Sequence, residues 1–219
     1  QLREKGVGHM LETVPFPTGT VEVTLDGAGI PSYEIRQGVA WDNIPFTPQI
    51  EELARHTRAA CFGSLAQRSP VSHRTIGRFL ETMPDGEGQY KVFDINLRQH
   101  FYTQQVVEES LRKCNILKIN DEELAVVGSM FGLEGMQPGE QCRTLLDRYG
   151  LRIVILTCGA AGSSVFAPDT RSYIPTPRVE VADTVGAGDS FTASFLAALL
   201  SGLGIGEAHR LAVDVAAHV

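Results

Sequence analysis

The chain has 219 residues, of which 43% are hydrophobic and 21% charged, and its formal net charge is −7. This length suits one domain, with or without a small appended element, and is short for two full domains. The acidic balance argues against nucleic acid or an anionic membrane as the main partner, and the apolar stretches are too short to cross a bilayer. The four scattered cysteines lack metal spacing, which indicates reduced thiols and a cytoplasmic protein.

Residues 20–36 predict a small β-hairpin. Apolar and polar residues alternate on both sides of a Gly-rich turn (TVEVTLDGAGIPSYEIR), which is typical of two strands with one face in water. We expect this hairpin to be attached to one α/β domain that comprises residues 1–19 and 37–219. The chain starts and stops inside helical patterns, so we expect the domain to be incomplete at both ends.

After the hairpin, short apolar strands alternate with helices. The predicted strands are Ala59–Phe62, Lys91–Ile95, Asn115–Ile119 and Arg152–Thr157, and the predicted helices are Pro48–Arg55, Pro70–Met83, Glu122–Phe131 and Glu140–Tyr149. Thr47 and Ser69 are the expected N-caps of the first two helices, and Gly150 is expected to close the fourth. This alternation predicts a mostly parallel sheet covered on both faces, with ligand sites beyond the carboxyl ends of its strands.

The stretch VADTVGAGDSFTASFLAALLSG predicts an anion site at a helix start. Gly186, Ala187 and Gly188 leave backbone N–H groups open to an anion, and Phe191–Leu200 supplies the helix behind them. Asp189 would repel a permanently held phosphate, but it is suited to deprotonating a hydroxyl that attacks phosphorus. The alternative is that Asp189 is an ordinary first-turn helix acid.

Two further motifs follow predicted strands and suit phosphate binding. TCGAAGS, which starts at Thr157, is a glycine turn suited to a nucleotide phosphate, although many such turns are only turns. NDEE predicts a capping box between Asn120 and Glu123, and it also suits a phosphate near Asn120 and hydrated magnesium near Glu123. These two interpretations of NDEE are compatible.

The motif DINLR follows the second predicted strand of the sheet. We expect an extended segment with Asp94, Asn96 and Arg98 on one side, an arrangement suited to sugar hydroxyls. Simple surface exposure is the alternative. A Walker loop, a GxSxG elbow and a histidine metal spacing are all lacking in the sequence, which argues against the familiar nucleotide cradles, hydrolases and zinc enzymes.

Together these motifs resemble the ribokinase-like (PfkB) carbohydrate kinases. DTVGAGD at 183–189 is similar to the family's C-terminal signature, and the NxxE and TxGxxG motifs precede it in the family's order. PTGTVEVTLDGAGIPSYEI, GVAWDNI, FGSLAQR and FDINLR look most like fructokinases. The resemblance implies a ribokinase-like three-layer fold, with residues 20–36 as a β lid that shields the sugar and that pairs between subunits in some members, which would give a homodimer.

The resemblance also implies an activity, namely ATP-dependent phosphorylation of a monosaccharide, with fructose at C6 favoured. Kinases for 2-keto-3-deoxygluconate, ribose or tagatose are alternatives, as is a non-catalytic sugar- or nucleotide-binding regulator on the same fold. The family's N-terminal sugar-binding segment and C-terminal adenine-binding segment are expected to lie outside this chain.

Residue roles follow from the same resemblance. Asp189 is the expected base, with an anion hole formed by Gly186, Ala187 and Gly188. The ATP phosphates are expected to contact Asn120, Thr157, Gly159, Gly162 and Gly188. Glu123 belongs to the motif tied to Mg²⁺, and Asp183 and the Val185 carbonyl match positions that bind a monovalent cation such as K⁺ in some members. The expected sugar-side residues are Gln67, Asn96, Arg98 and Asp189.

Overall fold

The computed structural model describes residues 2–25, 31–177 and 186–218. Its main sheet has six strands in the order β3-β4-β5-β6-β7-β8. These strands are β3 (Ala59–Phe62), β4 (Tyr90–Asp94), β5 (Ile116–Asn120), β6 (Ile153–Thr157), β7 (Ser163–Ala167) and β8 (Thr170–Ile174). Strands β3 to β6 are parallel, and β7 and β8 run antiparallel to their neighbours. The predicted α/β architecture with a mostly parallel sheet is confirmed.

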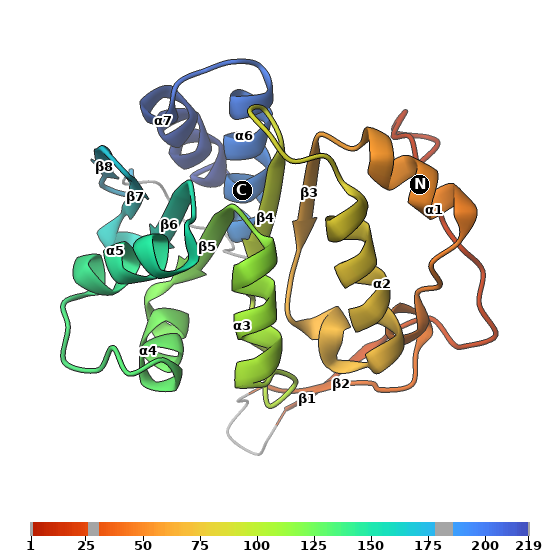
Figure 1. Cartoon of the computed structure of the whole chain (residues 1–219). Coiled ribbons are helices and arrows are strands. Elements are labelled where there is room, and N and C mark those ends of the chain that lie inside the picture. Colours follow the sequence, from red (N-terminus) through yellow and green to blue (C-terminus); the bar gives the residue numbers. More distant parts are fainter. Residues whose placement is uncertain (1, 26–30, 178–185, 219) are drawn as a thin grey trace.

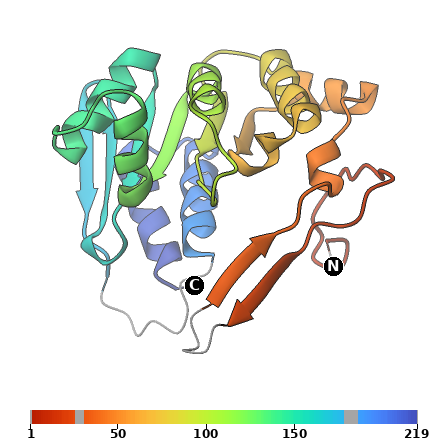
Figure 2. The ribbon, with the colours of Figure 1, turned by 90° about the horizontal axis from the view of Figure 1, so that it is seen from below.

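Helices lie on both faces of this sheet and give three layers (Figures 1 and 2). The helices are α1 (Pro48–His56), α2 (Pro70–Thr82), α3 (Gln104–Lys113), α4 (Asp121–Met130), α5 (Pro138–Tyr149), α6 (Ala187–Leu200) and α7 (Ile205–Ala216). Helices α2 to α5 lie on one face, with α1 beside α2, and helices α6 and α7 cover the other face. Strand alternation sorts the core accordingly, because Leu117 packs in the cluster with α3 to α5 and Ile116 packs in the cluster with α6 and α7.

The predicted hairpin is a separate two-stranded antiparallel sheet of β1 (Val21–Leu25) and β2 (Pro31–Ile35). It projects beyond the main sheet, as Figure 2 shows in red and orange. Val21, Val23 and Tyr33 share one face because Val23 pairs with Tyr33, and all three side chains are about half exposed. Ile35, which pairs with Val21 on the same face, is buried, so this apolar face is only partly open to solvent.

The expected helix ends agree with the structure in two cases out of three. The Thr47 hydroxyl accepts a hydrogen bond from the Ile50 N–H, and Gly150 closes α5 in the left-handed conformation with φ 63°. Ser69 occupies the N-cap position of α2, but its side chain makes no capping hydrogen bond among the described residues. The helix expected to begin at Phe191 already begins at Ala187.

Candidate active site

The first turn of α6 is a helix N-terminus suited to binding an anion. Gly186 is the N-cap with φ 90°, and among residues 2–25, 31–177 and 186–218 no side-chain hydrogen bond caps the turn. Gly188 and Asp189 are exposed, and Asp189 is the third residue of the helix. The first N–H groups of a helix have no partner within the helix, so this exposed turn has donors available for a phosphate.

Two observations place this turn beside β4 and β5. The Thr192 hydroxyl of α6 donates to Oδ2 of Asp94, the last residue of β4, over 2.8 Å. A Cβ atom added to Gly188 would lie 3.2 Å from Nζ of Lys118 on β5. The helix start therefore lies at the sheet edge where the motifs were expected to meet.

The motif DINLR does not form the extended segment that was expected. Strand β4 ends at Asp94, and Asn96 has a left-handed φ of 47°, which breaks the alternation of side chains. Asp94 is only 5% exposed and faces α6, whereas Arg98 is exposed. The prediction that Asp94, Asn96 and Arg98 share one side was therefore wrong.

This loop contains backbone strain that the sequence did not reveal. Asn96 and Gln99, with φ 47° and 49°, are the two non-glycine residues with positive φ in the described part of the chain. Such conformations cost free energy and persist where neighbouring contacts hold them. The Ser64 hydroxyl donates to the Asn96 carbonyl (3.2 Å), and the Leu97 N–H donates to Glu123 Oε1 (3.0 Å), so the loop is held from two sides.

The capping box between Asn120 and Glu123 is confirmed. Asn120 Oδ1 accepts from the Glu123 N–H (2.8 Å), and Glu123 Oε2 accepts from the Asn120 N–H (3.0 Å). Glu123 is 6% exposed, and its two oxygens each accept one backbone N–H, from Leu97 and Asn120. A carboxylate oxygen accepts more than one hydrogen bond, so Glu123 fits contact with a magnesium-bound water better than direct coordination. Residues 2–25, 31–177 and 186–218 contain no cluster of three or more His, Cys, Asp or Glu that could hold a metal ion.

The glycine turn lies directly beside this capping box. In the parallel register of β5 and β6, Asn120 is opposite Thr157. After Thr157 the chain turns through a 3₁₀ helix, η3 (Gly159–Ala161), and the Cys158 N–H donates to the Gly162 carbonyl (2.8 Å). Gly159 and Gly162 have φ of 50° and 106°, which glycine adopts at little cost. The structure thus brings NxxE and TxGxxG together.

Gln67 lies near the loop that contains Asn96 but points into the protein. It belongs to the 3₁₀ helix η2 (Leu65–Arg68) and is 6% exposed. Its Nε2 donates to the Gly63 carbonyl and to the Ser110 hydroxyl, both at 2.9 Å, and its Oε1 is 3.1 Å from His73 Nδ1. The amide is therefore occupied by protein partners in this structure.

Two expected cation positions, Asp183 and Val185, lie outside the described residues. Among the described helices, none is long and apolar enough to span a membrane.

All four cysteines are free thiols. Desolvation, together with the charge of Asp94, raises the pKa of the Cys61 thiol to about 11, with a smaller contribution from Asp189. Cys61 is therefore protonated at neutral pH beside the α6 turn and is a poor nucleophile.

Helix α7 is tied to the glycine turn by a buried histidine. His209 is fully buried, and its Nε2 and Nδ1 lie 2.8 Å from the hydroxyls of Ser163 and Ser172 respectively. Burial lowers the pKa of His209 to about 4, so the imidazole is neutral at neutral pH. Ser163 directly follows Gly162, which means that a packed neutral network supports one end of the turn.

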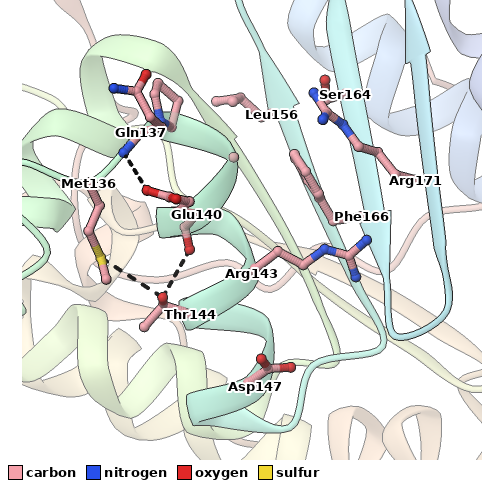
Figure 3. A pocket seen from close by; sticks show the side chains of 12 residues that line it. Met136, Gln137, Glu140, Arg143, Thr144, Asp147, Leu156, Ser164, Phe166 and Arg171 are labelled. Atoms are coloured by element: carbon pink, nitrogen blue, oxygen red, sulfur yellow. Dashed lines mark hydrogen bonds between the residues drawn. The ribbon is translucent and has the colours of Figure 1, made fainter.

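A separate pocket of about 860 Å³ lies between α5 and strands β6 to β8 (Figure 3). The guanidinium groups of Arg143 and Arg171 lie 5.6 and 5.3 Å from the ring centroid of Phe166. Phe166 belongs to the core cluster on the α3 to α5 face, whereas Asp189 begins the helix on the other face. The sheet therefore separates this pocket from the α6 turn, and we assign the pocket no part in the chemistry of that turn.

Comparisons with known proteins relate the chain to carbohydrate kinases. Residues 71–219 match the model of the pfkB family of carbohydrate kinases. A fructokinase of Rhizobium leguminosarum bv. trifolii is 31% identical over 160 residues, which cover 70% of this chain and 46% of the relative. The chain spans about half the length of the curated relatives that it matches.

Solved structures share the fold. An uncharacterized sugar kinase of Pyrococcus horikoshii, PH1459, superposes with a TM-score of 0.79 at 25% identity, covering 99% of this chain and 69% of that one. Aminoimidazole riboside kinase of Salmonella enterica, crystallised with aminoimidazole riboside and an ATP analogue, gives a TM-score of 0.76 at 20% identity, covering 99% and 72%. The ribokinase-like fold implied by the motifs is confirmed.

Proposed function

Because the chain belongs to the pfkB family of carbohydrate kinases, we propose that the whole protein transfers the γ-phosphoryl group of ATP to a sugar hydroxyl. The observation that carries this proposal is the meeting of three motifs at one sheet edge. The start of α6 adjoins β4 and β5, and Asn120 is opposite Thr157 at the ends of β5 and β6. Parallel α/β sheets bind ligands at this edge.

In the proposed reaction, Asp189 is the base. Its carboxylate takes the proton of the sugar hydroxyl, whose oxygen bonds to the γ-phosphorus while the bond between that phosphorus and the bridging oxygen breaks and ADP leaves. Gly186, Ala187 and Gly188 donate backbone N–H groups to the charge that develops on the transferred group. The exposure of Gly188 and Asp189 at the start of α6 supports both roles.

We assign ATP to the neighbouring turn. Asn120, Thr157, Gly159 and Gly162 are proposed to hold the phosphates, together with Gly188. Magnesium that arrives with ATP neutralises phosphate charge, and Glu123 is proposed to accept a hydrogen bond from one of its waters. A monovalent cation such as K⁺ at Asp183 and Val185 is also proposed from the family resemblance.

Fructose, phosphorylated at C6, is the proposed substrate. The similarity to the Rhizobium fructokinase supports it, as do the fructokinase-like stretches of the sequence. Asn96 and Arg98 are proposed to face the sugar from the strained loop. Gln67, whose amide is bonded inside the protein, is proposed to support this subsite from behind.

A substrate screen of the full-length protein tests this proposal. With ATP, we expect fructose to give a higher kcat/KM than ribose, tagatose, 2-keto-3-deoxygluconate or aminoimidazole riboside. Fructose among the poorest substrates would refute the sugar assignment and leave the kinase assignment intact. Binding of sugar and ATP without any sugar phosphate formed would favour a non-catalytic regulator instead.

The hairpin formed by residues 20–36 is proposed to be a lid over the sugar. The Gln99 side chain donates to the Tyr33 carbonyl of β2, and Gln99 adjoins Arg98. The base of the hairpin is held by Arg68, which donates to the Arg36 carbonyl (2.6 Å). Both contacts join the hairpin to elements on the proposed sugar side.

Replacing residues 20–36 by a short Gly-Ser loop in the full-length protein is expected to weaken sugar binding much more than ATP binding. Loss of a positioning element typically costs about 10- to 100-fold, and we expect the Kd for fructose to rise by that order. Calorimetric titrations of fructose and of ATP measure the difference. Equal loss of both ligands, or no loss, would contradict the lid assignment.

A homodimer through the lid is a further proposal, supported by the half-exposed apolar face of Val21, Val23 and Tyr33. Sedimentation of the same loop variant checks it, because the variant should then be monomeric.

We propose a cytoplasmic setting, since ATP is the proposed co-substrate and the cysteines are free.

A further inference from the structure

Lys118 is a buried lysine that none of the roles above uses. Its side chain is 9% exposed, and Nζ donates to Oδ1 of Asp94 over 3.1 Å. Lys118 lies two residues after Ile116 on β5, so both side chains are on the face that packs under α6 and α7. The ammonium is therefore directed toward the helix that begins with the proposed anion hole.

Hydrogen bonds connect this ion pair to the first turns of α6. The second oxygen of Asp94, Oδ2, accepts a hydrogen bond from the Thr192 hydroxyl (2.8 Å), and the same hydroxyl lies 3.1 Å from the Gly188 carbonyl. A Cβ on Gly188 would be 3.2 Å from Lys118 Nζ, which is closer than most real Cβ contacts. The ammonium thus lies close to the backbone of Gly188, and a side chain at this position would require it to shift by a few tenths of an ångström.

Stability alone gives a weak reason for a lysine here. The N-terminus of a helix carries a partial positive charge, which disfavours a nearby cation. Burying an ammonium also costs hydration free energy, and pairing with one carboxylate offsets this cost only in part. The position becomes favourable when an anion occupies the turn, because the ammonium and the helix N-terminus then attract the same negative charge.

We propose that Lys118 is a positioning residue for phosphoryl transfer. Through Asp94 and Thr192 it holds the first turns of α6 on the edge of β4 and β5, and its charge adds to the positive potential of the anion hole. This inference rests on the proposed kinase function. It assigns Asp94 to the support of the anion hole instead of the sugar.

The chain offers a matched control in Lys91 on β4. The Lys91 side chain is 7% exposed and pairs with Asp85 (2.6 Å), but it lies near the amino end of its strand, away from α6. Lys118→Met and Lys91→Met therefore remove equally buried lysines from neighbouring strands. A general effect of losing a buried charge should appear in both variants, and an effect on the anion hole only in the first.

The test measures kinetics and melting temperature of the full-length protein. Lys118→Met is expected to lower kcat by about 100-fold, the usual effect of losing one stabilising group in an oxyanion site, with the KM for sugar within about twofold. Lys91→Met should retain kcat. ADP with fluoroaluminate, a mimic of the transferring group, should raise the melting temperature of wild type and Lys91→Met but much less that of Lys118→Met.

A second pair of variants covers the case in which Lys118→Met does not fold. Thr192→Val removes the hydroxyl that joins Asp94 to α6 and should lower kcat by about tenfold, whereas Thr192→Ser keeps the hydroxyl and should remain near wild type. Equal kcat in Lys118→Met and Lys91→Met, or in the two Thr192 variants, would overturn the inference while leaving the kinase proposal intact. A wild-type protein that phosphorylates no sugar would overturn the proposed function itself.

Discussion

Replacing Asp189 by asparagine is expected to lower kcat by about 10²–10⁴-fold in the full-length protein, the usual contribution of a positioned general base. The amide has nearly the same shape as the carboxylate but cannot accept the proton of the attacking hydroxyl. Asp189 is exposed, so the substitution should leave the core and ATP binding nearly unchanged. Steady-state kinetics, an ATP titration and a thermal melt measure the three quantities.

Glu207 is the matched control for this prediction. It is the third residue of α7, as Asp189 is of α6, and its Oε2 accepts a hydrogen bond from the Gly204 N–H (3.1 Å). Glu207→Gln should cost about 0.3–1 kcal/mol in unfolding free energy and leave kcat unchanged, because it removes only a first-turn helix charge. If Asp189→Asn behaved in the same way, Asp189 would be an ordinary helix acid and the turn a binding element only.

The parts of the site that the sequence predicted correctly depend on local contacts. The capping box joins Asn120 to Glu123, and the Thr47 cap joins residues three apart. Such bonds follow from residue type and spacing. The adjacency of Asn120 and Thr157 also followed, because parallel strands bring their carboxyl ends to one edge.

The parts that the sequence did not predict depend on distant partners or on a broken local rule. Asp94 was assigned to the sugar because strand alternation was extended through Asn96, whose left-handed backbone ends it. The actual partner of Asp94, Thr192, is 98 residues away in the sequence. Lys118 was missed although a lysine inside the apolar run ILKIN was a usable signal, since a charge in a buried strand needs a partner.

The local sequence pattern also did not predict helix α3 or strands β7 and β8. Helix α3 was not predicted, although Val107 and Leu111 are fully buried with the spacing of one helical face. Strands β7 and β8 were not predicted either. Strand β7 pairs with β6 and β8 pairs with β7, both antiparallel, so their formation depends on an edge that the rest of the fold provides.

Substituting Gly162 by alanine is expected to destabilise the full-length protein by about 2–6 kcal/mol and to weaken ATP binding. Gly162 has φ 106° and ψ −162°, a region that side chains with a Cβ adopt only at a cost of about 1–3 kcal/mol. An added Cβ would also lie 2.5 Å from the Ile174 carbonyl oxygen and 2.9 Å from Pro175 Cα. Both are backbone atoms, so relief of the overlap would require movement of the chain and would add a further cost of about 1–3 kcal/mol.

Gly159→Ala separates backbone strain from steric overlap in the same turn. Gly159 also has a positive φ, 50°, but an added Cβ would meet no atom within 4 Å, so the expected cost is about 1–2 kcal/mol. Urea unfolding of both variants measures the difference in unfolding free energy. An equal decrease in the two variants would show that the turn moves to relieve the overlap at no measurable cost. We expect it to resist, because Ser163 directly follows Gly162 and its hydroxyl is 2.8 Å from Nε2 of the fully buried His209. A displaced Gly162 would strain that contact with α7, so the steric cost should be largest at the glycine that is most firmly held.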